Sequence, residues 1–202
     1  MIRTVIFDIG MVLVYFRWRE LYAQLGFEGE KFERIAKATV QNPWWNEFDK
    51  GLMTTEEVIE RFAESAPEYK KEITEIYEHM DEIVTLYDYA VPWIRELKEK
   101  GYRIYILSNW SKPAYEANLE TNLCFLKEVD GAVMSFMEGV IKPDPQIYEL
   151  ICNRYEIDPK EAVFLDDNAD NIEGARAFGL NAIHFQTYEQ ARAELNNILE
   201  EK

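Results

Sequence analysis

Short apolar runs alternate with stretches of helical periodicity over much of this chain, and this alternation restricts the fold more than any other feature. The pattern is typical of a parallel β-sheet, because a helix usually carries the chain back between neighbouring parallel strands. The expected strands are Thr4–Phe7, Arg103–Leu107, Ala132–Met134, Ala162–Leu165 and Ala182–Phe185. The sequence therefore predicts an α/β protein with a Rossmann-like, three-layer core around a parallel sheet.

Local signals place helices between these strands. Pro92 opens one helix and Gly101 ends it, and another begins near Pro145. Asn168 is expected to cap a further helix, which ends at Gly179. Each of these helices leads into a strand, as a parallel sheet requires.

Residues 16–88 interrupt the alternation. Their apolar side chains, Leu21 and Leu25 among them, recur at helical spacing, and no strand is evident. We therefore expect a helical cap over residues 16–88, lying over one end of the sheet. The core would then consist of residues 1–15 and 89–202.

The charge of the chain excludes some partners. With 38 acidic and 22 basic side chains, the formal net charge is −16 at pH 7, which repels phosphodiester backbones and anionic membranes. The apolar run Met1–Phe7 is too short for a signal peptide, and no stretch approaches the roughly 18 apolar residues of a membrane span. Cys124 and Cys152 lie in no paired motif, which is typical of a reducing compartment. We expect no nucleic-acid or membrane partner and a cytoplasmic location.

Polar residues follow several of the expected strands. Asp8 ends the first, Ser108–Asn109 the second and Asp166–Asn168 the fourth, while Lys142 follows the third by a short loop. Ligands of open parallel sheets bind beyond the carboxyl ends of the strands, so these side chains should share one crevice. Taken singly, each has an ordinary structural explanation as a helix cap, a turn former or a solvated charge.

Taken together, in this order and spacing, these residues resemble the four motifs of the haloacid dehalogenase-like hydrolase superfamily. The motifs are Phe7–Gly10, Leu107–Asn109, Lys142–Pro143 and Phe164–Asn171. The resemblance covers essentially the whole chain and is greatest to the phosphatases with a helical cap after the first strand. It implies a Mg²⁺-dependent hydrolase whose partner is a small-molecule phosphate ester, such as a sugar phosphate.

The resemblance also implies a role for each motif residue. Asp8 would be the nucleophile that forms an aspartyl-phosphate, which divides hydrolysis into two displacements. Asp8, the backbone carbonyl of Gly10 and Asp167 would bind Mg²⁺, which relieves repulsion between carboxylate and phosphate. Asp166 would ligate the ion directly or through water, and Asn171 would orient a ligand rather than bind the ion.

Two further motifs would bind the phosphoryl group. Ser108 and the backbone N–H groups near Asn109 would hold its oxygens, and Lys142 would neutralise charge on the phosphate and on Asp8. Ser108 and Lys142 are therefore expected to act in catalysis together with Asp8.

One position departs from the pattern. Most phosphatases of this superfamily carry a second Asp two residues after the nucleophile, which protonates the leaving oxygen, and here that residue is Gly10. Without that proton, leaving groups that carry negative charge unaided should be favoured. Hexose 1-phosphates should therefore outperform 6-phosphates, unless a cap residue or a water supplies the proton.

The cap contains an aromatic stretch, Asn42–Gly51, that has two interpretations. Trp44 and Trp45 could form a platform for the ring of a sugar phosphate, because flat aromatic faces pack against sugar rings. They could equally be a hydrophobic clamp between cap helices.

Two other functions compete with the phosphatase. A metal-independent haloacid dehalogenase would use Asp8 in the same way, but the adjacent Asp166 and Asp167 would repel an ionised nucleophile in the absence of a cation. A non-catalytic phosphate-binding protein would not need Asp8, Ser108, Lys142 and Asp167 together.

Overall fold

A five-stranded parallel sheet forms the centre of the protein, in the order β5-β4-β1-β6-β7, in a computed structural model that describes residues 1–200. Its strands are β1 (Thr4–Phe7), β4 (Arg103–Ser108), β5 (Gly131–Met134), β6 (Ala162–Asp166) and β7 (Asn181–His184). Each overlaps one of the strands expected from the sequence. The predicted α/β class and parallel sheet are therefore confirmed.

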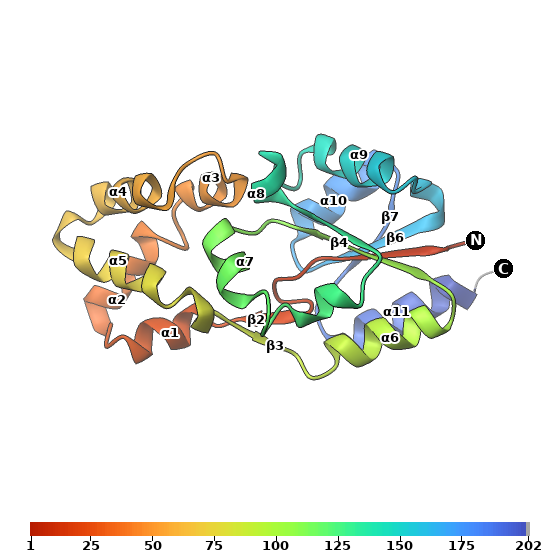
Figure 1. The fold of residues 1–202 in the computed structure, drawn as a ribbon, viewed down its shortest axis with the longest axis horizontal. Coiled ribbons are helices and arrows are strands. Elements are labelled where there is room, and N and C mark those ends of the chain that lie inside the picture. Colours follow the sequence, from red (N-terminus) through yellow and green to blue (C-terminus); the bar gives the residue numbers. More distant parts are fainter. Residues whose placement is uncertain (201–202) are drawn as a thin grey trace.

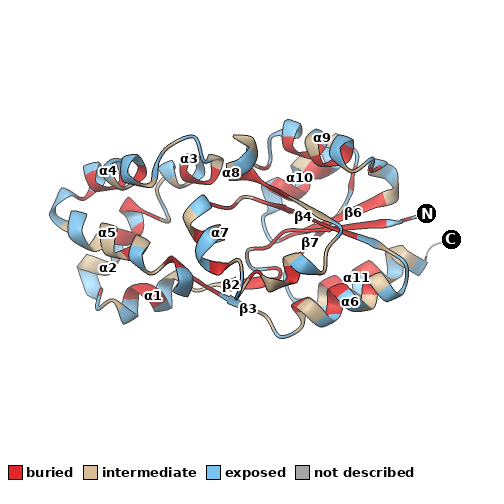
Figure 2. Ribbon diagram, viewed as in Figure 1, coloured by how far each residue is buried: buried red, intermediate tan, exposed pale blue. Residues whose placement is uncertain are grey.

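Helices cover both faces of the sheet. The helices outside the cap segment are α6 (Ala90–Glu99), α7 (Lys112–Asn118), α8 (Ser135–Glu138), α9 (Pro145–Arg154), α10 (Ala169–Phe178) and α11 (Tyr188–Glu200), with short 3₁₀ turns at Cys124–Lys127 and Pro159–Glu161. Two further 3₁₀ turns, Pro67–Tyr69 and Met80–Glu82, lie within residues 16–88. α6 and α11 lie on one face, and α9 and α10 lie on the other (Figure 1). The central strands β1, β4 and β6 are buried almost throughout and the edge strands β5 and β7 only in part, whereas the helices bury one side only (Figure 2). These three layers match the predicted architecture.

The alternation of side chains along β1 explains why both faces are covered. Phe7 packs edge-on against Trp93 of α6, with ring centroids 4.9 Å apart. Ile6 belongs to the opposite cluster, with Ile147 of α9. Because successive residues of a strand point to opposite faces, an apolar strand needs cover on both sides.

Five helices lie together beyond one end of the sheet (Figure 1). These cap helices are α1 (Trp18–Gln24), α2 (Gly29–Ala38), α3 (Trp44–Lys50), α4 (Thr55–Ser65) and α5 (Lys70–Glu78). Their apolar sides meet in the middle, where Ile35, Phe62 and Ile73 are fully buried. Thr54 caps α4 by accepting a hydrogen bond from the backbone N–H of Glu57.

The expectation that residues 16–88 contain no strand is wrong. β2 (Val14–Phe16) and β3 (Val84–Leu86) pair antiparallel where the chain enters and leaves the cap helices. Both are three residues long, too short for an alternating pattern to stand out in a sequence. They form the double connection between the cap helices and the sheet.

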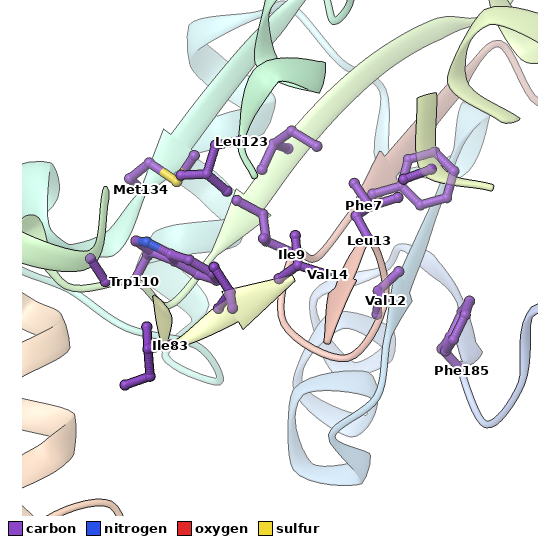
Figure 3. Packing of buried hydrophobic residues seen from close by; sticks show 14 of the residues in the cluster. Phe7, Ile9, Val12, Leu13, Val14, Ile83, Trp110, Leu123, Met134 and Phe185 are labelled. Atoms are coloured by element: carbon purple, nitrogen blue, oxygen red, sulfur yellow. The ribbon is translucent and has the colours of Figure 1, made fainter. Parts of the chain in front are cut away.

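The loop after β1 is firmly packed. Figure 3 shows Ile9, Val14, Ile83 and Trp110 close together, although they come from separate parts of the chain, and all four are buried. This packing fixes the backbone on both sides of Gly10. Within residues 1–200, no helix is both long enough and apolar enough to cross a membrane.

Candidate active site

Asp8 lies immediately beyond β1 and is 6% exposed. Ser108 Oγ and Lys142 Nζ each donate a hydrogen bond of 2.7 Å to Asp8 Oδ1. Within residues 1–200, Asp8 Oδ2 accepts no hydrogen bond. One carboxylate oxygen is therefore held in place, while the other is free to react or to bind a cation.

Lys142 joins two of the carboxylates. Its Nζ donates to Asp8 Oδ1, to Asp166 Oδ2 at 2.6 Å and to the carbonyl of Leu107 at 3.0 Å, and the residue is 2% exposed. Burial acts to lower the pKa of Lys142, but the charges of Asp166 and Asp8 outweigh it and raise that pKa. The side chain is therefore a charged ammonium with all three protons donated.

The side chain of Asn109 holds the backbone of Lys142. Its Nδ2 donates to the carbonyl of Lys142 at 3.0 Å, and its Oδ1 accepts from the N–H of Lys142 at 2.8 Å. The amide is therefore already paired on both sides. Of the groups at Asn109 that are predicted to bind phosphate, only the backbone takes no part in these two hydrogen bonds with Lys142.

The two carboxylates after β6 differ in their surroundings. Asp166 is fully buried and accepts hydrogen bonds from Lys142, from the N–H of Asn168 at 2.8 Å and from Asn171 Nδ2 at 3.1 Å. Asp167 is more exposed, and within residues 1–200 its side chain accepts no hydrogen bond from another residue. Asp166 is thus held on both oxygens, whereas Asp167 is open to a ligand.

These carboxylates make a suitable cation site. One oxygen from each of Asp8, Asp166 and Asp167 lies within 4.8 Å of the others, and Lys142 supplies one positive charge against three. Burial raises the pKa of Asp8 to about 6, and Lys142 only partly offsets it. Burial and the charges of Asp8 and Asp166 raise the pKa of Asp167 to about 7. A divalent cation would remove this repulsion, and oxygen ligands suit Mg²⁺.

A cavity of 310 Å³ opens beside Asp8 and Asp167, between the sheet and the cap helices. Its lining includes Asp8, Gly10, Met11, Phe16, Trp45, Asn46, Asp49, Met80, Ile83, Val84, Asn109, Trp110, Ser111, Ala114, Lys142, Asp167, Asn168 and Asn171. Most of the predicted site residues therefore meet at one cavity. Its wall on the cap side is largely apolar.

The two tryptophans of α3 have different positions. Trp45 lines the cavity and packs against Phe16 and Phe62, with centroids 6.0 and 6.1 Å away. Trp44 is absent from the lining, is 38% exposed, and has the Arg61 guanidinium 5.2 Å from its ring centroid. Adjacent helical residues point about 100° apart, so only one of them can face the cavity. The predicted platform does not include Trp44.

Asp49 is the site residue that sequence reasoning missed. It lies on α3 four residues after Trp45, so both side chains share one face of the helix and both line the cavity. That spacing was the available signal, but a carboxylate on a cap helix is usually solvated.

A family model for haloacid dehalogenase-like hydrolases matches residues 2–179. The chain belongs to this family. It is therefore a hydrolase, and its relatives include proteins named as phosphatases and as dehalogenases. The Mycobacterium tuberculosis protein named phosphatase MT3486 is 27% identical, over 90% of this chain and 86% of that one.

Other relatives vary in length and name. The mouse acyl-CoA dehydrogenase family member 10 is 30% identical over 98% of this chain, which spans only 19% of that protein. The Aspergillus oryzae sesquiterpene phosphatase AstK is 23% identical, over 90% of this chain and 89% of its own length. (S)-2-haloacid dehalogenase 4A of Burkholderia cepacia is 31% identical over 50% of this chain and 43% of its own.

Solved structures agree with the haloacid dehalogenase-like fold. The family enzyme BT-2542 of Bacteroides thetaiotaomicron superimposes with a TM-score of 0.76 and 21% identity, over 96% of this chain and 98% of that one. The same enzyme was also solved as a complex with magnesium and inorganic phosphate, with a TM-score of 0.73 and 22% identity, over 94% of this chain and 98% of that one.

Proposed function

We propose that the protein is a Mg²⁺-dependent phosphatase that hydrolyses a small phosphorylated metabolite through an aspartyl-phosphate. The observation that carries this proposal is the state of Asp8, a member of the carboxylate cluster whose Oδ1 is held by Ser108 and Lys142 while its Oδ2 accepts no hydrogen bond from residues 1–200. A fixed carboxylate with one free oxygen is suited to nucleophilic attack. The relatives named as phosphatases support the same chemistry.

The family roles can be assigned to residues as follows. Asp8, the carbonyl of Gly10 and Asp167 would hold Mg²⁺, which when bound neutralises charge between the nucleophile and the phosphate. Asp166 acts by holding Lys142, because its oxygens already accept hydrogen bonds. Asn171 orients Asp166 through its amide.

The phosphoryl group would be bound next to Asp8, where Oδ2 can reach its phosphorus. Ser108 Oγ and Lys142 Nζ already lie 2.7 Å from Asp8 Oδ1, so both lie close to any phosphate that the carboxylate attacks. The backbone near Asn109 borders the same cavity. We propose that residues 16–88 form the cap that covers this site, over the core of residues 1–15 and 89–202.

Metal dependence and Asp8 provide the test. Hydrolysis of para-nitrophenyl phosphate should require Mg²⁺ and stop in a chelator, and Asp8→Asn should retain the fold with less than about 1% of the turnover. Asp167→Ala should lose activity and recover part of it at high Mg²⁺.

Turnover of 2-chloropropionate in a chelator would favour the dehalogenase instead. Phosphate binding without turnover of any substrate would favour the non-catalytic alternative.

The leaving group that we propose is a sugar, as in a hexose 1-phosphate. The segments Ile6–Gly10 and Phe164–Ala175 resemble those of α-D-glucose-1-phosphate phosphatase, which shares the glycine at position 10. The ring of Trp45 and the amide of Asn46 border the cavity and suit a sugar ring with hydroxyl groups.

The apolar cap-side wall favours a second substrate class. Met80, Ile83 and Val84 offer no hydrogen bond from their side chains to a sugar hydroxyl, and burying a hydroxyl without a partner is costly. Together with the relative named sesquiterpene phosphatase, this wall favours the monophosphate of an apolar alcohol. A panel of glucose 1-phosphate, glucose 6-phosphate and geranyl monophosphate, compared by kcat/KM, decides between the two classes.

A further inference from the structure

Asp49 carries a carboxyl group that has no hydrogen-bond or ion-pair partner among residues 1–200. The residue is 9% exposed and lines the same cavity as Asp8. Within residues 1–200, its carboxyl oxygens take part in no hydrogen bond or ion pair; the contact of this residue outside its helix is made by its backbone carbonyl, which accepts from Ser135 Oγ at 2.6 Å. Its carboxyl oxygens are not among the fully enclosed unpaired side-chain atoms of residues 1–200, which are Tyr77 Oη and Trp110 Nε1, so the carboxyl opens onto the cavity, where it can meet a bound ligand.

The position of Asp49 is set by contacts between α3 and α8. Ser135 accepts a hydrogen bond of 2.9 Å from the N–H of Trp110 and donates to the carbonyl of Asp49. Two residues later, Gly51 comes so close that a Cβ there would lie 2.5 Å from the carbonyl oxygen of Phe136. The backbone of Asp49 is thus fixed against the core, while its carboxyl remains free in the cavity.

The charged groups around this carboxyl favour its protonated form. Burial raises the pKa of Asp49 to about 8; the charge of Asp8 acts in the same direction and that of Lys142 opposes it. Asp167 adds a further carboxylate to the lining of the same cavity. At neutral pH the side chain is therefore largely a neutral acid, which is the state that a proton donor needs before the first displacement.

We propose that Asp49 is the general acid and base of this enzyme, replacing from the cap the carboxyl group that Gly10 lacks. The inference rests on the phosphatase function proposed above. In the first step, the bond from Asp8 Oδ2 to phosphorus forms, the bond from phosphorus to the leaving oxygen breaks, and the Asp49 proton passes to that oxygen. The alcohol leaves, and Asp49 becomes a carboxylate.

The second step restores both carboxyl groups. A water oxygen bonds to phosphorus while the bond from phosphorus to Asp8 breaks, and the water proton passes to the Asp49 carboxylate. Inorganic phosphate leaves, Asp8 is again a carboxylate, and Asp49 is again protonated. Each proton that Asp49 gives in the first step is recovered in the second.

Leaving-group dependence separates this role from a structural one. With Asp49 as donor, the advantage of hexose 1-phosphates that Gly10 alone predicts should be small in the wild-type protein. Asp49→Asn keeps the size of the side chain and removes the acid, so the ratio of kcat/KM for glucose 1-phosphate to that for glucose 6-phosphate should rise at least about tenfold, within the range of general acid catalysis.

Rapid-quench kinetics test the second step. Nitrophenolate leaves without a proton, so Asp49→Asn should release about one equivalent of it in a burst and then turn over slowly, because hydrolysis of the aspartyl-phosphate lacks its base. We expect a steady-state loss of about 10²- to 10⁴-fold. Glu47→Gln is the control, since Glu47 lies on the same helix, pairs with Lys50 and is absent from the cavity lining; it should behave as wild type.

The outcomes distinguish this inference from the proposed function. Wild-type kinetics in Asp49→Asn, or equal losses on all substrates with a raised KM and no burst, would overturn the role of Asp49 alone. If Asp49→Asn does not fold, Asp49→Ala with added formate replaces it: restored turnover supports the role, and its absence overturns it. If the wild-type protein hydrolyses no phosphate ester with Mg²⁺, or if Asp8→Asn is fully active, the proposed function itself fails.

Discussion

Lys142 is the residue on which the electrostatics of the site depend. Within residues 1–200, it is the only cationic side chain that pairs with Asp8 or Asp166, and all three groups are buried. A buried ion pair adds little stability compared with an apolar replacement of the whole group. Removing one member, however, leaves uncompensated charge in a medium of low dielectric constant.

We therefore predict that Lys142→Met destabilises the protein by about 3–5 kcal/mol, the usual cost of breaking a buried pair. Urea denaturation at pH 7.5 in the absence of metal measures it. Lys112→Met is the control, because Lys112 is exposed and lies 3.7 Å from Glu116, and such surface pairs contribute about 0–1 kcal/mol. Equal losses in the two variants would contradict the assignment of Lys142 as the counter-charge.

The tryptophans of α3 provide a second prediction about single residues. Trp45→Ala should raise KM for glucose 1-phosphate more than for para-nitrophenyl phosphate, and should also reduce stability, because Trp45 packs against Phe16, Phe48 and Phe62. Trp44→Ala should change both properties little, since its ring lies outside the cavity. KM values on both substrates and thermal melting check this. If Trp45→Ala lowers the melting temperature but leaves both KM values unchanged, Trp45 is a hydrophobic clamp between cap helices rather than a platform for the substrate.

Residue type and position after a strand predict most of the residues that the structure brings together in the candidate site. Asp8, Ser108, Lys142 and Asp167 were expected to meet because parallel strands end at one edge of a sheet. The sequence could not separate Trp44 from Trp45, because the orientation of a helix about its own axis depends on tertiary packing. Asp49 was missed for the same reason: the burial of a carboxylate is a property of the docked helix.

Among the elements, the long ones were predictable and the short ones were not. β4 and β6 are six and five residues long and each contains four consecutive apolar residues, and their flanking helices carry Pro, Asn and Gly signals. β2 and β3 pair over three residues each, and their pairing joins positions far apart in the sequence. Such contacts form only when the two segments meet in the folded protein, so they leave no local pattern in the sequence.

The contact between α3 and α8 yields a prediction about two glycines. Gly51 ends α3 with φ +68°, and Gly29 begins α2 with φ +55°, so an alanine at either position adopts a left-handed backbone at a cost of about 1–2 kcal/mol. At Gly51 the new Cβ also meets the backbone of Phe136, whereas at Gly29 no neighbouring atom of residues 1–200 lies within 4 Å.

Gly51→Ala should therefore lose about 1–3 kcal/mol more stability than Gly29→Ala, as overpacked sites do. It should also impair kcat, since a displaced α3 carries Asp49 away from Asp8. Chemical denaturation and steady-state kinetics of the two variants measure both effects. Equal stability and equal kcat in the pair would show that α3 is not held against α8 in solution.

For the whole molecule, the net charge of −16 opposes the binding of a phosphorylated substrate in the site. The acidic surface repels a phosphorylated substrate at long range, although salt screens this beyond about 8–10 Å. Inside the cavity, Lys142 is already neutralised by Asp8 and Asp166. A bound divalent cation would therefore add positive charge beyond that of Lys142, whose charge is shared with these two carboxylates.

The same burial makes the stability of the metal-free protein depend on pH. Asp49, Asp167 and Asp8 have pKa values of about 8, 7 and 6, raised chiefly by burial, against about 3.9 for Asp in an unfolded chain. At a pH between about 3.9 and its native pKa, each of these carboxyl groups is protonated in the native state and ionised in the unfolded state. The free energy of unfolding therefore falls as pH rises from about 4 to about 8, by at most about 1.4 kcal/mol per pH unit for each proton.

Between pH 6 and 8 the buried carboxyl groups that titrate are Asp49, Asp167 and in part Asp8, whereas surface carboxylates with ordinary pKa values are already ionised there. In the absence of metal, we predict that the wild-type protein loses stability from pH 6 to pH 8 and that Asp49→Asn loses distinctly less, since its amide does not titrate. The histidines and Asp167 are common to both proteins, so the difference between the two curves belongs to Asp49. Urea unfolding at pH 6, 7 and 8 measures it. Parallel curves would mean that the carboxyl of Asp49 titrates in the native state as it does in water, and the protonated acid required for leaving-group catalysis would then be absent at neutral pH.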